Sequence, residues 1–282
     1  MSDLTIEQLT IRELVTLDEY QACVAFQDET WGHGFSERVP AAILRVGQKL
    51  GGVSAGAFEP TGRMAGFVFG LTGIMDGSLV HWSDMLAVAP DWRNRQLGER
   101  LKHYQAERVR ALGVRTMMWT FDPLVARNAH FNINRLRAFP SEYIPDMYGA
   151  NTGSTLHGAI PTDRFVISWD LERALSVPPG DPAPAVGDAA LPLLNPLDAS
   201  GAPSCVTTER EPTVRVQVPA DSQAITTAST ELAARWRYAV RSCVVPLMRD
   251  GYRVARFVRG RGDTLPYYVF TRDSAPLPLP PT

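Results

Sequence analysis

The sequence predicts an α/β (α+β) fold with a small C-terminal β-α-β-β extension. Three observations indicate it. Segments of alternating apolar and polar residues interleave with segments of helical periodicity, a proline-rich stretch divides the chain, and strand and helix patterns resume after that stretch. The chain has 282 residues, 45% hydrophobic and 21% charged, so it can bury a substantial core as one large domain or two small ones.

The elements before the prolines are predicted from local patterns. Residues 9–14 begin with the alternation of a half-buried strand, and residues 17–31 space their apolar side chains as a helix does. A turn at Glu59-Pro-Thr-Gly62 joins two β-prone runs into a hairpin. Pro90 begins a long helix that ends before Gly113. The expected strands are 9–14, 52–58, 64–72, 81–88, 114–121, 143–148 and 165–171, and the expected helices are 17–31, 37–50, 90–111 and 125–138.

Proline density predicts the domain boundaries. Eight prolines between Pro178 and Pro212 exclude a regular helix or central strand, so residues 176–211 are expected to be an extended surface linker. The expected domains are therefore 1–175, the linker, a small extension over 212–273 and a loose tail over 274–282. The extension has the predicted strand 213–218, helix 229–251 and hairpin 252–258 and 267–271. It is too small to fold alone, so we expect it to pack on the first domain or on a second subunit, which leaves a homodimer open.

The charge balance excludes several classes of partner. Lys and Arg total 28 against 30 Asp and Glu, a formal net charge of -2, so neither nucleic acid nor an anionic membrane is an expected partner. No apolar stretch has the about 20 residues that span a bilayer, and the acidic start lacks a secretion signal. We expect a cytoplasmic protein.

The cysteine pattern predicts no disulfide framework. Cys23, Cys205 and Cys243 are odd in number, scattered and without C-x-x-C spacing, so reduced packing residues are favoured over a zinc site or a nucleophile. The histidines lack metal-binding spacing as well, and we expect no metal.

The strongest functional signal is the stretch from Asp84 to Leu101. A predicted strand leads into a loop with Arg93 and Arg95, and the loop enters an amphipathic helix. Free N–H groups at a helix N-terminus, its dipole and two guanidinium groups form a site for a pyrophosphate. A near-neutral chain can therefore bind a polyanionic cofactor locally.

These residues resemble the pyrophosphate loop of the GNAT superfamily of acyl-CoA N-acyltransferases, with the pattern V-x-P-x-x-R-x-x-G-x-G/A. Val88, Pro90, Arg93 and Gly98 match it, while Gln96 stands where the family usually has its first glycine. The element order agrees, and the resemblance implies a GNAT-like mixed, mostly antiparallel sheet flanked by helices. It also implies a bulge or splay of the fourth strand, expected near residues 86–88.

The second βα unit extends the resemblance. Asn128 and Asn132 are i, i+4 neighbours on a helix that lies beside the cofactor's pantetheine arm in this superfamily, and Ile133 stands near its usual tyrosine acid. One branch of predicted acyltransferases shares D-P-L-x-x-R-N-A-x-F-N, a later P-T-D-R-F segment, and W-R and G-Y-R segments in a C-terminal extension. The implied cofactor-binding residues are Leu86, Ala87, Val88, Arg93, Asn94, Arg95, Gln96, Leu97, Gly98, Asn128 and Asn132.

Acyl transfer to an amine requires a group that removes a proton. Asp84, Asp122 and His130 are the catalytic candidates, and His81 lies on the same predicted strand as Asp84. Each has a structural alternative: Asp122-Pro as a cap and turn, His130 as a packing residue, and Asp84 as a buried hydrogen-bonded carboxylate. The arginines of Trp236-Arg-Tyr-Ala-Val-Arg241 favour a solvated basic helix face over a site for an acceptor carboxylate.

The resemblance implies an enzyme that moves an acetyl group, or another short acyl group such as succinyl, from acyl-CoA to the amine of a small molecule. An amino acid is the leading acceptor, because the near-neutral charge disfavours a large charged acceptor. The alternative is a catalytically degenerate GNAT module that binds CoA or a partner without turnover, which Gln96 and the missing tyrosine favour.

Overall fold

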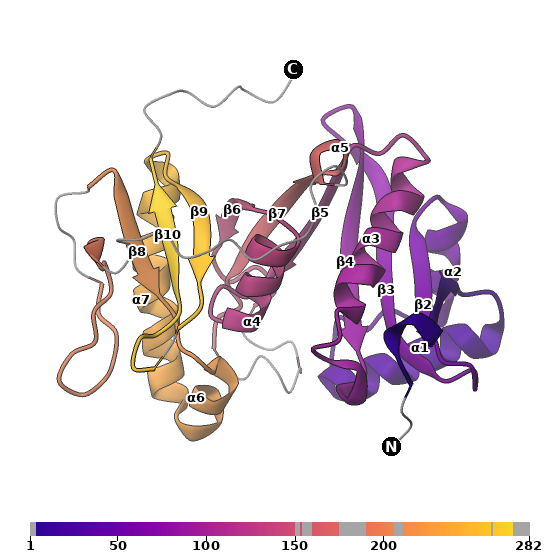
Figure 1. Cartoon of the computed structure of the whole chain (residues 1–282), viewed down its shortest axis with the longest axis horizontal. Coiled ribbons are helices and arrows are strands. Elements are labelled where there is room, and N and C mark those ends of the chain that lie inside the picture. The colour runs from indigo at the N-terminus through magenta and orange to yellow at the C-terminus, as the bar shows by residue number, and fades with distance from the viewer. Residues whose placement is uncertain are drawn as a thin grey trace. The chain divides into compact units, whose positions relative to one another are not determined.

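The chain folds into two compact units. The computed structural model describes residues 4–149, 153, 160–174, 190–205, 211–260 and 262–272. Unit 1 contains the described parts of 1–120, 151–158 and 167–178, and unit 2 contains those of 121–150, 159–166 and 179–282 (Figure 1). Residues 121–150 thus group with the C-terminal segment. The domain boundaries expected from the prolines stay a prediction.

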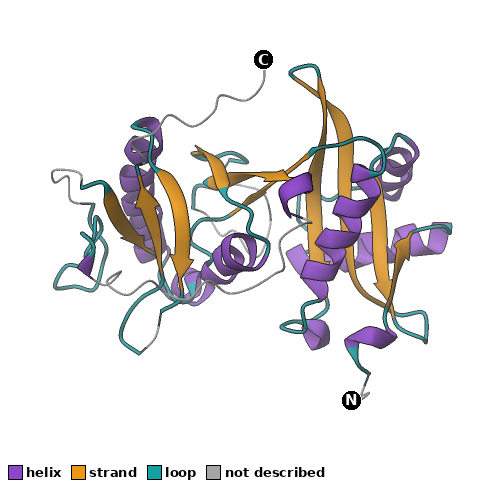
Figure 2. Ribbon diagram, turned by 45° about the horizontal axis from the view of Figure 1, so that its top comes forward, coloured by secondary structure: helices purple, strands orange, loops and turns teal. Residues whose placement is uncertain are grey.

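Unit 1 is a sheet with helices on both faces, as Figure 2 shows. Its elements are β1 (Thr10–Glu13), α1 (Leu17–Trp31), α2 (Ala41–Lys49), β2 (Val53–Phe58), β3 (Met64–Met75), β4 (Ser78–Val88), α3 (Leu97–Arg110), β5 (Thr116–Phe121, whose last residue belongs to unit 2), and the second half of β7 (Arg164–Asp170), followed by α5 (Leu171–Ala174). Strands β1 to β4 pair antiparallel, and β4 pairs parallel with β5. The mixed, mostly antiparallel sheet and the predicted element order are confirmed.

Side-chain alternation along β3 assigns the helices of unit 1 to opposite faces. Phe67 contacts Phe26 of α1, with ring centroids 5.6 Å apart. Its neighbour Gly66 turns the other way, and a Cβ there would lie 3.2 Å from Leu101 of α3. Therefore α1 lies on one face and α3 on the other.

The hairpin of β3 and β4 is longer than predicted. Its strands reach Met75 and begin again at Ser78, joined by Asp76 and Gly77 with φ of 50° and 75°. An Asp-Gly pair with positive φ at both positions suits the tight turn of a hairpin, and this pair is the local signal in the sequence for the longer strands.

Unit 2 combines a second βα segment with the C-terminal segment. Its elements are α4 (Ala126–Ala129), a π-helix (His130–Arg135), β6 (Pro140–Ile144), the first half of β7, β8 (Thr213–Gln217), α6 (Ser222–Ala228), α7 (Thr230–Arg249), β9 (Arg253–Val258) and β10 (Tyr267–Thr271). The C-terminal strands form a three-stranded antiparallel sheet in the order β8-β10-β9. The predicted C-terminal strands and hairpin are confirmed, and α6 is an additional helix.

Four expectations about single elements are wrong. The helix expected over 90–111 begins at Leu97, because a 3-10 turn and two positive-φ residues precede it. The helix expected over 125–138 becomes a π-helix after four residues. The strand expected at 143–148 lies at 140–144 and ends before Asp146, whose φ is 50°. The fourth concerns the linker.

The described part of the linker is folded rather than extended over the surface. Residues 190–205 contain Leu194, Asn195 and Ala202, all at most 5% exposed. Asn195 donates to the Gln217 carbonyl at 2.8 Å and accepts the Gln217 N–H at 2.8 Å. A proline-rich segment that satisfies its polar groups in this way can be part of a core. The stretches 175–189 and 206–210 and the tail 273–282 lie outside the described residues.

Among the described helices, none combines the length and the apolar composition needed to cross a membrane.

Candidate cofactor loop and acyl-transfer site

One edge of β4 opens toward β5 in unit 1. The parallel pairing between these strands runs only from Val80 to Trp82 of β4. Further along, the Ala89 N–H donates to Ala65 on the β3 side at 2.9 Å, so the N–H groups of Val88 and Leu86 turn to the opposite, β5 side. The strand therefore separates from β5 before residues 86–88, as expected for a splay.

The bulge of β4 lies at Asp84, which corrects its expected place near residues 86–88. Gly70 and Phe69 of β3 are opposite Ser83 and Met85, so Asp84 is the extra residue. The carboxylate reaches solvent but is crowded by protein. This crowding, followed by the charge of Glu37, raises the pKa of Asp84 against a hydrogen bond from Trp82. A solvent-accessible carboxylate with a raised pKa suits proton removal from an ammonium group.

His81 is excluded as a base by its position. Its side chain is fully buried, and Nδ1 lies 2.9 Å from the Thr72 hydroxyl. Burial, with a contribution from Lys102, lowers the pKa of His81 to about 3. The imidazole is therefore neutral and enclosed in the core, out of reach of a substrate.

The loop between β4 and α3 ends in a strained backbone. Asn94 and Gln96 have φ of 61° and 64°. Gln96 is the N-cap residue of α3 and is left-handed, so it adopts the conformation for which glycine is normally required. The Gln96 side chain does not cap this 14-residue helix, and the first N–H groups of an α-helix, here those of Leu97 and Gly98, have no acceptor within the helix. These donors at the positive end of the dipole suit a phosphate group.

Hydrogen bonds and an ion pair hold the start of the loop between β4 and α3 against the hairpin turn of β2 and β3. Trp92 is 2% exposed, and its indole N–H donates to Glu59 Oε1 at 2.8 Å. Arg63 bridges Glu59 and Asp91, and its hydrogen bonds, with that of Trp92, lower the pKa of Glu59 against the effect of burial. The loop is thus held rigidly at one end, a support that the sequence analysis missed.

The two loop arginines each make one backbone contact and remain exposed. Arg93 Nε donates to the Val88 carbonyl at 3.2 Å, and Arg95 Nη1 donates to the Leu4 carbonyl at 3.1 Å. Arg95 also lies over the Trp92 ring, 5.1 Å from its centroid. A guanidinium group has five N–H donors, so both arginines keep donors for an anion at the loop.

Gln96→Gly is expected to increase the free energy of unfolding by about 0.5–1 kcal/mol, because glycine adopts a left-handed backbone without the Cβ penalty. Urea denaturation of the full chain measures this effect. Asn94→Gly is the matched control and should gain less, since asparagine tolerates this conformation better. A loss of stability in Gln96→Gly would show that the glutamine side chain outweighs the backbone strain.

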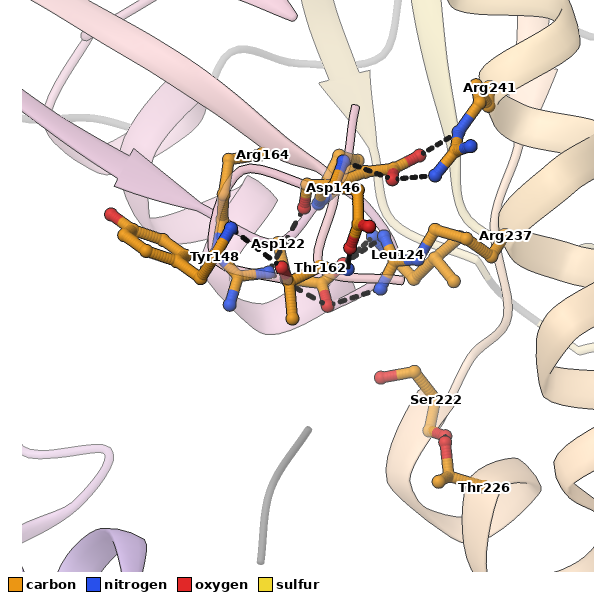
Figure 3. A network of polar contacts seen from close by, with 12 residues as sticks. Asp122, Leu124, Asp146, Tyr148, Thr162, Arg164, Ser222, Thr226, Arg237 and Arg241 are labelled. Atoms are coloured by element: carbon orange, nitrogen blue, oxygen red, sulfur yellow. Dashed lines mark hydrogen bonds and ion pairs between the residues drawn. The ribbon is translucent and has the colours of Figure 1, made fainter. Parts of the chain in front are cut away.

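A buried ion pair dominates unit 2. Arg237 of α7 binds both oxygens of Asp122, at 2.8 and 2.6 Å, and Arg164 lies 3.5 Å from the same carboxylate (Figure 3). The Leu124 N–H also donates to Asp122 at 2.8 Å. Burial alone would raise the pKa of Asp122, but Arg237 and these partners lower it. Asp122 is therefore held as an ionised ligand of the arginines, which makes it a weaker base than Asp84.

A second arginine of α7 has a carboxylate partner next to this pair. Arg241 Nε donates to Asp163 Oδ2 at 2.9 Å, and Asp163 also accepts the Tyr143 hydroxyl. Arg237 is 2% exposed, so the expectation of a solvated basic face is wrong for it. The spacing of the apolar residues along α7 is the sequence signal for this burial. Arg237 and Arg241 continue the apolar stripe of α7, which consists of Ala233, Trp236, Val240, Val244 and Leu247.

The π-helix of unit 2 arranges the remaining predicted residues. Asn132 donates to the Asn128 carbonyl at 2.9 Å, while His130 Nδ1 lies 3.0 Å from the Asn134 amide. Asn134 also donates to the Phe257 carbonyl of β9 at 3.0 Å. The C-terminal segment therefore contacts the π-helix through β9.

The predicted site residues fall into two groups. Unit 1 holds Asp84, Leu86, Ala87, Val88, Arg93, Asn94, Arg95, Gln96, Leu97 and Gly98 along one continuous strand and loop, and unit 2 holds Asp122, Asn128, His130 and Asn132 within one turn and helix. In the part of the chain that the structure describes, no group of three or more His, Cys, Asp or Glu residues could hold a metal ion.

No family model and no curated protein sequence matches this chain. Solved structures do. The ribosomal-protein-S18-alanine N-acetyltransferase from Escherichia coli is 17% identical over 63% of this chain and 97% of its own, with a TM-score of 0.44. A GNAT superfamily phosphinothricin acetyltransferase from Sinorhizobium meliloti, in complex with AcCoA, is 14% identical over 61% of this chain and 93% of its own, with a TM-score of 0.45.

The described topology agrees with the fold that the sequence resemblance to the GNAT superfamily implies. It has three antiparallel pairings, a bulged fourth strand that separates from the fifth, and the loop and helix that follow.

Proposed function

We propose that the protein is an N-acyltransferase that uses acyl-CoA. The observation that carries the proposal is the open edge of β4, which leads directly into the uncapped N-terminus of α3. Backbone donors on the strand suit a pantetheine arm or a thioester carbonyl, and the helix terminus suits the pyrophosphate. The site would hold the cofactor without a metal ion.

In the proposed reaction, the acceptor amine attacks the thioester carbonyl. A C–N bond forms and the C–S bond breaks. The proton of the attacking nitrogen passes to a base, CoA leaves as a thiolate, and the protonated base or solvent then supplies the proton that makes it a thiol. Asp84 is the favoured base for two reasons. It lies two residues before Leu86, where the open edge of β4 begins, and its pKa is raised. Asp122 and His130 stay alternative candidates, and Asn128 and Asn132 stay proposed contacts of the cofactor.

The acyl group and the acceptor are proposed by class: an acetyl or another short acyl group such as succinyl, and a small amine such as an amino acid. Support comes from the near-balanced charge, with 28 basic and 30 acidic residues, which favours no large charged acceptor. A cytoplasmic location and a homodimer also stay predictions. Screening free amino acids, including D-isomers, against acetyl-CoA and succinyl-CoA tests this assignment, and activity on peptide termini alone would overturn it.

CoA is expected to bind the wild-type chain in calorimetry, and Arg95→Ala and Arg93→Ala are each expected to weaken binding by about 1.5–3 kcal/mol, since each removes a charge-assisted contact. Arg110→Ala is the matched control. This arginine lies in the last turn of the same helix, far from the loop, and its loss should leave the affinity unchanged. An absence of binding at millimolar CoA would reject the proposed cofactor.

A module that binds CoA without turnover is the second candidate. Ile133 stands near the position of the tyrosine acid in the superfamily, and its hydrocarbon side chain has no proton to donate. Release of free thiol from acyl-CoA in the presence of an amine panel separates the two candidates. Robust release would reject the binding-only function.

A further inference from the structure

Residues 190–205 are fixed against the C-terminal helix of unit 2. Asn195 is paired with Gln217 of β8 through the contacts described above, and the Leu194 N–H donates to the Arg215 carbonyl at 3.0 Å. Asp198 accepts a hydrogen bond from Arg235 of α7 at 2.8 Å. The approach of this segment to α7 is therefore determined by contacts with two separate elements.

These contacts bring two thiols together. The sulfur atoms of Cys205 and Cys243 lie 2.8 Å apart, and Cys243 also lies 3.6 Å from the Leu194 carbonyl. Nonbonded carbon atoms rest about 3.5–4.0 Å apart and sulfur is larger, so the two sulfur atoms are inside contact distance. The pair has no local signature in the sequence, because 37 residues separate the two cysteines along the chain.

We propose that Cys205 and Cys243 are a redox modification site. A small disulfide such as oxidised glutathione oxidises the two thiols, and a reversible disulfide bond forms between Cys205 and Cys243. Cys205 is the more exposed of the two and Cys243 is buried. The Cys205 thiolate attacks the small disulfide, forming a mixed disulfide and releasing one thiol. The Cys243 thiolate then attacks the Cys205 sulfur, forming the intramolecular S–S bond and releasing a second thiol. The protein loses two protons and two electrons, and the small disulfide gains them.

The bond would join residues 190–205 covalently to α7. Closing a loop of this length restricts the unfolded chain, so the oxidised protein should unfold at a temperature about 4–10 °C higher than the reduced protein. Cys23 should not take part. It is buried in α1 of unit 1, whereas Cys205 and Cys243 belong to unit 2 and lie in contact with each other.

The test treats the full chain with oxidised glutathione and counts free thiols after denaturation. The wild type should fall from three thiols to one, and peptide mapping should find Cys205 joined to Cys243. Dithiothreitol should restore all three. Cys205→Ser and Cys23→Ser are the matched variants. The first should keep the same melting temperature with or without oxidant, and the second should show the full thermal shift.

Three outcomes would overturn the proposal. They are three thiols remaining after oxidation, a stable glutathione adduct on Cys205 that Cys243 does not displace, and disulfides between chains instead of within one. Each is read directly by mass spectrometry on the wild-type protein, so the result does not depend on the folding of a variant.

Discussion

Asp84→Asn is expected to lower kcat for acyl transfer by about 10²–10⁴-fold, because it removes the group that takes the proton from the attacking amine. The affinity for CoA should stay close to that of the wild type, since the loop from Arg93 to Gly98 and the open edge of β4 are unchanged. Steady-state kinetics and calorimetry on the same preparations separate these effects. An Asp84→Asn variant that keeps full activity would move the proton-removing role to another residue.

The dependence of activity on pH provides a second test of Asp84 as the base. A base must be ionised, so activity should fall as the pH drops through the raised pKa of Asp84. The charge of Glu37 contributes to that increase. Glu37→Gln should therefore lower the pKa of Asp84 and shift the acidic limb of the profile to lower pH. A limb that stays in place or moves to higher pH would contradict the assignment.

Arg237→Met is expected to lower the free energy of unfolding by about 3–5 kcal/mol, because it leaves the Asp122 carboxylate largely buried without its principal partner. Urea denaturation of the full chain measures this. The folded-state pKa of Asp122 is lowered, so the stability it contributes is present above the unfolded value of about 3.9 and is lost as pH falls through the folded value. The difference between wild type and variant should therefore narrow in acid.

Arg235→Met provides the matched control on the same helix. Arg235 pairs with Asp198 at 2.8 Å, but both side chains are more than one third exposed. An exposed pair of this kind contributes about 0–1 kcal/mol. Equal losses from Arg235→Met and Arg237→Met would show that the effect comes from α7 itself and not from the buried ion pair.

The sequence predicted what short-range patterns determine. Strand and helix order follow from periodicity, and the position of the candidate cofactor loop follows from a motif between residues 88 and 98. The bulge at Asp84 could not be placed, because it depends on the register between β3 and β4. The left-handed conformation of Gln96 was also hidden, since few residues other than glycine adopt it.

Long-range pairing accounts for the other differences. Asp122 and Arg237 are 115 residues apart, and Asn195 and Gln217 meet across the proline-rich stretch. A high density of prolines excludes a regular helix or a central strand. It does not determine whether the side chains of the segment are buried and hydrogen-bonded. A charged residue within the apolar stripe of α7 was the one local sign that an acidic partner must lie in the core.

The separation between Asp122 and Arg237 also sets an order of events during synthesis. A ribosome adds about 5–20 residues each second, so Asp122 emerges about 6–23 s before the arginine that neutralises it. The strands from β1 to β4 and helix α3 are complete by then. The turn that contains Asp122 must wait until α7 has been synthesised, and strands β9 and β10 of unit 2 are added later still.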